Sequence, residues 1–435
     1  MTDRKAVIVL SQSGQEKMLG LSLRQRLILS ASEAGWPEFW LYHPDRAQAQ
    51  KAVFELSADR RILQRNIHLR ILGQKEARDR LLSAAGNDYL LVVDDNLVLD
   101  PGIFSKLAES LTGFNQPLAR IEIRGKDGSN QLCPGLLLVR PGAGLELVLS
   151  QVLAGKSVSQ IEVGSDLALA SLVLPTGFAV AAGDRKSFNR ARQLLLQTAR
   201  KPQDGLVARL INRRISLFLT RYFLYLNIHP VVQSIITLAV GLLSAVFVGY
   251  GRQLLVPGGI LFELASIIDG CDGENARLTY RITRTGRILD ISGDAVTFVS
   301  FFAALPLGLY RTYGGKTWLY LGALALLSMV AFYLQLINYA RKTGLNYNIV
   351  AVVKEVEASQ DKPGFKNPLD RLASRLAFIY RRDFFSMAAF ILIVAGLARL
   401  AMGLVAVLAF LEAAYFYFYS RRKLTAGLQR KGELP

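Results

Sequence analysis

The chain has 435 residues, of which 51% are hydrophobic, and it carries a formal net charge of +18. It is too long for one ordinary domain, and with a mean hydropathy of +0.28 it is too apolar and too basic for a typical soluble enzyme. Its basic residues gather at the ends of long apolar runs, for example at 421–423. We therefore expect this charge to face anionic membrane lipids and not a nucleic acid.

Residues 1–200 alternate short β-rich runs with segments of helical length. Five runs predict strands: 6–10, 39–43, 69–72, 89–94 and 135–140. Strands separated by helices are typical of a mainly parallel sheet in a three-layer sandwich. The sequence therefore predicts a soluble α/β domain here. Neither of the two cysteines, Cys133 and Cys271, has an expected disulfide partner.

The second half of the chain is dominated by apolar runs. Residues 201–228 mix arginines into an apolar helical pattern and predict a helix in the membrane interface. Residues 229–422 predict an all-α membrane domain with six spans: 230–250, 254–279, 286–310, 316–340, 383–399 and 401–420. Residues 423–435 are expected to form a basic cytoplasmic tail. By the positive-inside rule, the basic connections after every second span place both termini in the cytoplasm and the protein in the cell membrane.

Four aspartates lie inside this apolar half. Asp269 and Asp272 are three residues apart, and Asp290 and Asp294 are four apart, so each pair shares one helix face and the two faces can converge. A charge near the bilayer centre costs about 2.5–3.5 kcal/mol on insertion scales, so a compensating cation is expected. Oxygen-only ligands suit Mg²⁺ or Mn²⁺. Two such ions could bridge a pyrophosphate and leave one aspartate free to accept a proton.

Small residues accompany the acids on these helix faces. Gly273, Ala276 and Gly286 would let a backbone or a flat ligand approach closely, although helix packing alone is an alternative interpretation. Arg277 follows on the same helix and could balance a carboxylate or bind phosphate. The combination favours a site for a phosphorylated ligand.

These residues resemble the signature of the CDP-alcohol phosphotransferases, D-x-x-D-G-x-x-A-R, eight residues, then G-x-x-x-D-x-x-x-D, which fits from Asp269 to Asp294 without a substitution. The resemblance implies a six-helix membrane fold, a homodimer, two divalent ions, and displacement of CMP from a CDP-linked donor by an alcohol. It implies that Asp269, Asp272 and Asp290 are metal ligands, and that Asp294 is a metal ligand and the general base. The nucleotide pocket would be lined by Asp269, Gly273, Ala276, Arg277 and Gly286.

The match is incomplete upstream and leaves the substrates open. Many members of the family open the first span with P-N-x-x-T, whereas this chain has Pro230, Val231 and Ser234. The donor could be CDP-diacylglycerol or a CDP-polyol, and the acceptor alcohol could be a polyol phosphate. A membrane metal-dependent CDP-alcohol hydrolase and a divalent-cation transporter are the alternatives.

The first half resembles a nucleotidyltransferase domain of the kind fused to the family in inositol-phosphate cytidylyltransferase proteins. An active domain of this type wraps phosphates with a glycine-rich loop. Here the loop S-Q-S-G-Q-E-K-M-L holds one glycine, Gly14. Lys17 could contact phosphate, and Asp94 and Asp95 end a strand where a metal-binding acid could lie. We expect a degenerate domain that supports or regulates the membrane half.

Overall fold

The computed structural model describes residues 4–72, 89–111, 114–125, 128–163, 169–200, 212–343 and 382–430. The chain forms two compact units that do not strictly follow chain order. The N-terminal unit contains residues 1–201 together with two short segments from the second half, 223–227 and 275–281. The helical unit contains the rest.

A seven-stranded mixed sheet forms the centre of the N-terminal unit, in the order β10-β8-β9-β6-β1-β4-β5. Its strands are β1 (Lys5–Val9), β4 (Glu38–Tyr42), β5 (His68–Ile71), β6 (Leu90–Asp94), β8 (Leu118–Arg124), β9 (Asn130–Val139) and β10 (Leu169–Leu174). Neighbouring strands are parallel except around β9, which is antiparallel to β6 and to β8. Two further strand pairs are short: β2 (Lys17–Met18) with β3 (Leu21–Ser22), and β7 (Leu97–Leu99) with β11 (Ala179–Ala181).

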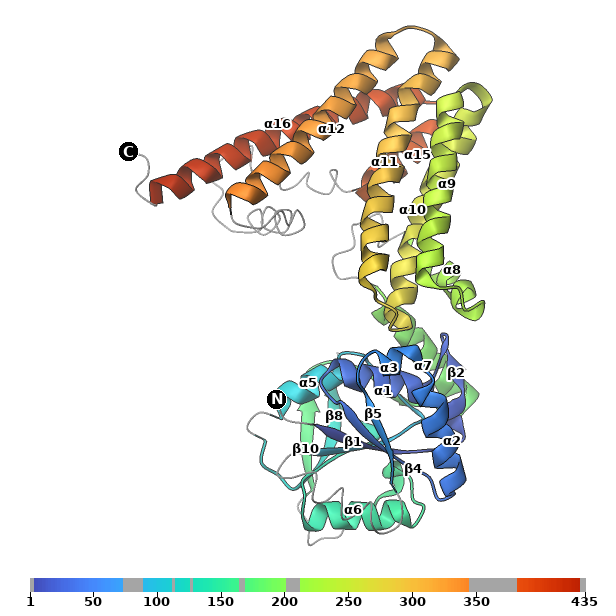
Figure 1. The fold of residues 1–435 in the computed structure, drawn as a ribbon, viewed down its shortest axis with the longest axis vertical. Coiled ribbons are helices and arrows are strands. Elements are labelled where there is room, and N and C mark those ends of the chain that lie inside the picture. The colour runs from blue at the N-terminus through green and yellow to red at the C-terminus, as the bar shows by residue number, and fades with distance from the viewer. Residues whose placement is uncertain are drawn as a thin grey trace. The chain divides into compact units, whose positions relative to one another are not determined.

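Helices cover both faces of this sheet, which confirms the predicted three-layer α/β domain (Figure 1). One face packs on α1 (Leu23–Glu33), α2 (Arg46–Ser57), α3 (Arg60–Leu63) and α5 (Ile103–Ser110), and the other face packs on α6 (Ala143–Leu153). Strand β1 serves both cores because successive side chains alternate. Ala6 and Ile8 join the first, and Val7 and Val9 join the second. Helix α7 (Arg185–Thr198) follows the last strand.

The sequence located five strands of the sheet but not β8 and β10. Strand β8 carries charged residues, Arg120 and Glu122, at alternate positions, so its apolar signal is weak. The predicted strand at 135–140 is the end of a longer β9 that starts at Asn130 and runs antiparallel to its neighbours. Pairing direction is a tertiary property that a short apolar run does not encode.

The helical unit consists of long apolar helices. They are α8 (Arg213–Tyr225), α9 (Pro230–Tyr250), α10 (Leu255–Leu278), α11 (Arg284–Tyr313), α12 (Thr317–Lys342), α15 (Arg382–Val394) and α16 (Ala398–Arg430). Five stretches within the described residues are long and apolar enough to cross a membrane, and they correspond to α9, α10, α11, α12 and α16. The sixth expected span, 383–399, corresponds to α15, which has 13 residues. Most of the connection before it, 344–381, lies outside the described residues.

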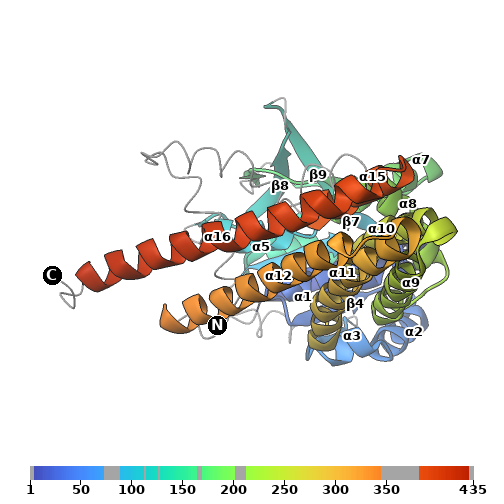
Figure 2. The same cartoon turned by 90° about the horizontal axis from the view of Figure 1, so that it is seen from above.

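Helices α9 and α11 approach closely because glycines face the neighbouring helix. A Cβ atom on Gly241 would overlap the Thr297 side chain, and one on Gly308 would overlap the Val248 carbonyl oxygen. Small residues at such crossings let backbones touch. Helices α12 and α16 also lie side by side in both views, with the Tyr339 and Phe416 rings 5.9 Å apart (Figure 1, Figure 2). The contact with α9 involves the helix that carries Asp290 and Asp294.

Helix α8 has two different faces. Ser216, Leu217 and Thr220 are buried, whereas Phe218 and Tyr222 are exposed. This amphipathic pattern is compatible with the predicted interfacial helix, of which 201–211 lie outside the described residues.

Candidate active site

Helices α10 and α11 bring acidic side chains together. Asp269 and Asp272 on α10 and Asp290 on α11 each offer a carboxylate oxygen, and these three oxygens lie within 4.8 Å of one another. The convergence expected from the spacing of the acids therefore occurs for three of the four aspartates. Asp294 lies one turn after Asp290 on α11, is partly buried, and falls outside this group.

The three carboxylates fit a hard divalent cation. Asp272 is only 4% exposed, and the other two are partly buried. Ionised carboxylates this close repel one another, and the repulsion grows as water is excluded. Mg²⁺ binds oxygen ligands at about 2.0–2.1 Å, so a small adjustment of these side chains would allow them to share an ion. Asp269, Asp272 and Asp290 are the residues that would hold it.

Ser234 on α9 supports this acidic group. Its hydroxyl donates a short hydrogen bond to Asp272 Oδ2, and both side chains are buried. The bond fixes the orientation of the Asp272 carboxylate, as partners of metal ligands commonly do. Ser234 occupies the last position of the upstream P-N-x-x-T pattern, and its contact with Asp272 was not predicted from the sequence.

Gly286 lies in the first turn of α11. Thr283 is the N-cap, and its hydroxyl oxygen accepts a hydrogen bond from the Gly286 N–H at 3.0 Å. This cap sets where α11 begins, and therefore where Asp290 lies along it. The assignment of Gly286 to a nucleotide pocket stays a prediction.

Glu274 lies between the signature residues and was not predicted to have a role. Its side chain is fully buried and accepts hydrogen bonds from three α8 residues: Arg213 at 2.9 Å, Ser216 at 2.7 Å and Thr220 at 2.7 Å. It is two residues from Asp272, about 200° around the helix, so it faces away from the acidic group. The available signal was an ionisable residue inside an apolar span, which implies a buried partner.

Arg277 and Ala276 end the first part of the signature. The Arg277 guanidinium donates to the backbone carbonyl of Ala199 from Nε at 3.0 Å and from Nη2 at 2.6 Å, and both residues belong to the N-terminal unit. The Ala276 carbonyl accepts the N–H of Arg281 at 2.9 Å. The roles of Arg277, Ala276 and Gly273 in binding a nucleotide stay predictions.

In the N-terminal unit, Asp95 directly follows β6, and both of its carboxylate oxygens accept hydrogen bonds from other residues of the protein. Asp95 is fully buried, and its Oδ2 accepts hydrogen bonds from Arg24 Nε at 2.9 Å and Nη2 at 2.7 Å. Its Oδ1 accepts from the N–H and hydroxyl of Ser11. A Cβ atom on Gly14 would overlap this carboxylate, so the loop lies directly on it. Burial raises the pKa of Asp95 above its usual value, and Arg24 and Ser11 oppose this shift.

The Asp94 carboxylate also accepts hydrogen bonds from the protein. Its oxygens accept the backbone N–H groups of Val158 at 2.8 Å and Ser159 at 3.2 Å. Burial raises the pKa of Asp94 to about 6, and these two N–H groups oppose the shift. Lys17, the predicted phosphate contact, is exposed on β2. Both carboxylates therefore bind groups of the protein itself, and Gly14 of the loop packs directly against Asp95.

Comparison with known proteins finds a similarity in the helical part of the chain. Residues 229–412 match the family model described as CDP-alcohol phosphatidyltransferase. The matched region contains all eight signature residues. The family whose model matches this part of the chain is the one that the aspartate signature resembles.

The relatives share a single description. The chain is 30% identical over 220 residues to "Bifunctional IPC transferase and DIPP synthase" of Thermococcus kodakarensis, covering 50% of this chain and 48% of that protein. It is 32% identical over 132 residues to the protein of the same name from Aquifex aeolicus, covering 30% of each. The chain thus spans about half the length of the first relative and about a third of the length of the second.

Two solved structures show a weak likeness. HddC from Yersinia pseudotuberculosis is similar at 11% identity and a TM-score of 0.32, over 44% of this chain and 98% of that one. A putative glucose-1-phosphate thymidylyltransferase from Bacillus anthracis is similar at 11% identity and a TM-score of 0.31, over 44% and 94%.

Proposed function

We propose that this chain is an integral membrane CDP-alcohol phosphotransferase, which moves a substituted phosphate from a CDP-linked donor to an acceptor alcohol and releases CMP. The observation that carries the proposal is the convergence of Asp269, Asp272 and Asp290 from two apolar helices within the family signature. Two Mg²⁺ or Mn²⁺ ions bound there would neutralise charge on the pyrophosphate and on the transferring group.

In this mechanism the acceptor hydroxyl oxygen attacks the phosphorus that bears the donor alcohol. A new phosphorus–oxygen bond forms, the bond to CMP breaks, and CMP leaves with the electron pair. Asp294 takes the hydroxyl proton, a role supported by its position one turn beyond Asp290 and outside the acidic group. Ser234 holds Asp272 in place throughout.

The N-terminal unit, in this proposal, does not transfer nucleotides. Asp95 is paired with Arg24 under the Gly14 loop, and Asp94 is bound by backbone N–H groups, so neither acid is available to a metal–nucleotide complex. Incubation of the full chain with CTP, Mg²⁺ and a panel of sugar and polyol phosphates should release no pyrophosphate. Release at enzymatic rates would refute this part.

The proposal also includes a homodimer and a cytoplasmic N-terminal unit. The orientation rests on Arg281, Arg284 and Arg287 in and beside the turn between α10 and α11. Arg284→Cys in a background lacking Cys133 and Cys271 should react with a membrane-impermeant thiol reagent in inside-out vesicles and not in intact cells. The opposite pattern would reverse the orientation.

Product analysis tests the activity itself. Purified protein is given CDP-diacylglycerol or CDP-polyols with a panel of alcohols, including polyol phosphates, and the products are identified by mass. Transfer should require both the alcohol and a divalent ion, and Asp294→Asn should abolish turnover while Mn²⁺ binding persists. CMP release without an alcohol would indicate a hydrolase, and near-normal turnover of Asp294→Asn would exclude its role as base.

A further inference from the structure

The last turn of α10 belongs to the N-terminal unit. Helix α10 ends in a tight cap: the N–H of Arg281 donates to the Ala276 carbonyl at 2.9 Å, and the N–H of Tyr280 donates to the Arg277 carbonyl at 3.4 Å. Tyr280 has the left-handed backbone, with φ of 56°, that such a cap needs and that glycine usually supplies. The cap therefore holds a tyrosine in a left-handed conformation that residues other than glycine rarely adopt.

Burial of the Tyr280 ring explains this choice. Tyr280 is 5% exposed and joins the hydrophobic core of the N-terminal unit, together with residues of α1 and α5. A glycine would adopt the turn more readily but would leave the ring's place in the core empty. The tyrosine therefore attaches the end of α10 to the N-terminal unit.

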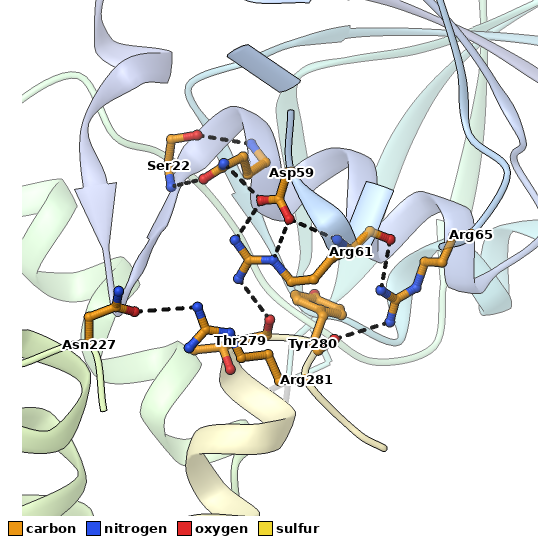
Figure 3. A network of polar contacts seen from close by, with 9 residues as sticks. Ser22, Asp59, Arg61, Arg65, Asn227, Thr279, Tyr280 and Arg281 are labelled. Atoms are coloured by element: carbon orange, nitrogen blue, oxygen red, sulfur yellow. Dashed lines mark hydrogen bonds and ion pairs between the residues drawn. The ribbon is translucent and has the colours of Figure 1, made fainter. Parts of the chain in front are cut away.

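Three arginines of the N-terminal unit hold the same turn by its backbone. Arg26 donates to the Leu278 carbonyl at 2.9 Å, Arg61 to the Thr279 carbonyl at 3.1 Å, and Arg65 to the Tyr280 carbonyl at 3.3 Å. Figure 3 shows Arg61 and Arg65 reaching the turn from α3 and the residues that follow it. The last carbonyls of a helix lack partners within the helix and carry its partial negative charge, so cations are favourable there. We call Arg26, Arg61 and Arg65 the arginine clamp.

Other residues of the N-terminal unit orient the clamp. Asp59 accepts hydrogen bonds from Arg61 Nε at 2.8 Å and Nη2 at 2.5 Å, and Gln25 donates to the same carboxylate at 3.0 Å. Burial would raise the pKa of Asp59, but its hydrogen bonds with Arg61 hold it below the usual value, so the carboxylate is charged at neutral pH. Glu33 pairs with Arg65 at 3.0 Å. The guanidinium groups of Arg61 and Arg65 are thus each held by an acidic side chain as well as by the turn.

We propose that the N-terminal unit, through the arginine clamp and Tyr280, positions the end of the signature helix for binding of the CDP-linked donor. The clamped carbonyls follow Ala276 and Arg277 directly, and these lie one turn beyond Asp272 on the same helix. The Arg277 side chain is itself held by the Ala199 carbonyl. Arg26, Arg61, Arg65 and Tyr280 are positioning residues, and their role rests on the proposed transferase function.

The test uses the full chain in detergent or nanodiscs. Arg61→Ala and Arg65→Ala each remove one clamp bond, and Tyr280→Gly removes the ring while keeping a residue suited to the turn. Arg60→Ala is the matched control because Arg60 lies in the same helix and is exposed. Hydrogen exchange at the amides of residues 279–281 and steady-state kinetics with a CDP-linked donor are measured for each variant.

Each clamp variant should raise amide exchange in the turn and the KM for the donor by about tenfold, the change expected for loss of one charge-assisted hydrogen bond. The kcat should change less, Arg61→Lys should recover part of the donor KM, and Arg60→Ala should match the wild type. Unchanged exchange would refute the clamp. Faster exchange with an unchanged donor KM would refute positioning and leave only a structural contact.

The two proposals fail separately. If the wild-type chain releases no CMP with any donor, the transferase function fails, whereas the exchange measurement still decides whether the clamp holds the turn. If the wild type is active and all variants keep the wild-type KM, the positioning proposal fails and the transferase function stands.

Discussion

The buried pair between Arg24 and Asp95 gives the sharpest prediction for the N-terminal unit. Arg24→Met keeps most of the side-chain length but removes both hydrogen bonds to Asp95 Oδ2, at 2.9 and 2.7 Å. The Asp95 carboxylate is fully buried and would keep only the Ser11 contacts. Removal of one partner from a buried ion pair costs about 3–5 kcal/mol, because a charge stays buried without compensation.

Hydrogen exchange at the β1 and β6 amides of the full chain measures this loss locally. A cost of about 3 kcal/mol corresponds to exchange roughly two orders of magnitude faster. The double variant Arg24→Met with Asp95→Asn removes the stranded charge as well, so it should regain about 0.5–3 kcal/mol relative to the sum of the single changes.

The pH dependence has a definite sign. Without Arg24, the pKa of Asp95 rises further above its value in the unfolded chain, so the folded state prefers the protonated carboxyl. The loss caused by Arg24→Met should therefore be smaller in mildly acidic buffer and larger as the pH rises. Exchange within about threefold of wild type would refute the structural role of the pair. Protection of the wild-type β6 amides by CTP and Mg²⁺ would show that Asp95 is available to a nucleotide.

Three further predictions follow from single contacts. Burial raises the pKa of Asp94 from 3.8 to about 6. The stability that the protonated Asp94 carboxyl contributes to the N-terminal unit, on the order of 3 kcal/mol, should therefore be present below the unfolded pKa and lost as the pH rises through about 6. Urea unfolding across this pH range checks the prediction. Glu274→Ala should expose the α8 amides to exchange because three donors lose their acceptor, and Glu274→Gln should do so less. Gly308→Ala should lower the free energy of unfolding of the helical unit by about 1–3 kcal/mol, because the added methyl group overpacks the contact with Val248. Gly403→Ala should not lower it, because a Cβ atom there meets open space.

Helical periodicity determined much of the helical unit from the sequence alone. Apolar runs located α9, α10, α11, α12 and α16, and the spacing of three and four residues put each pair of aspartates on one face. Both properties are local, since a helix repeats every 3.6 residues whatever surrounds it. The aspartate signature is also a local pattern, because it lies within residues 269–294, and the family model matches a region, 229–412, that contains it. The same local logic located β1, β4 and β6 in the other half.

Tertiary structure alone decided which groups these residues meet. The sequence placed Asp95 at the end of a strand, but only the fold brings it against Arg24, 71 positions away. It placed the end of α10 near residue 279, but the contact of Arg26 with Leu278 joins residues 252 positions apart. Ser234 with Asp272, and Glu274 with three residues of α8, are of the same kind. Such contacts depend on which faces pack together, and packing is set by the whole chain and not by any window of the sequence.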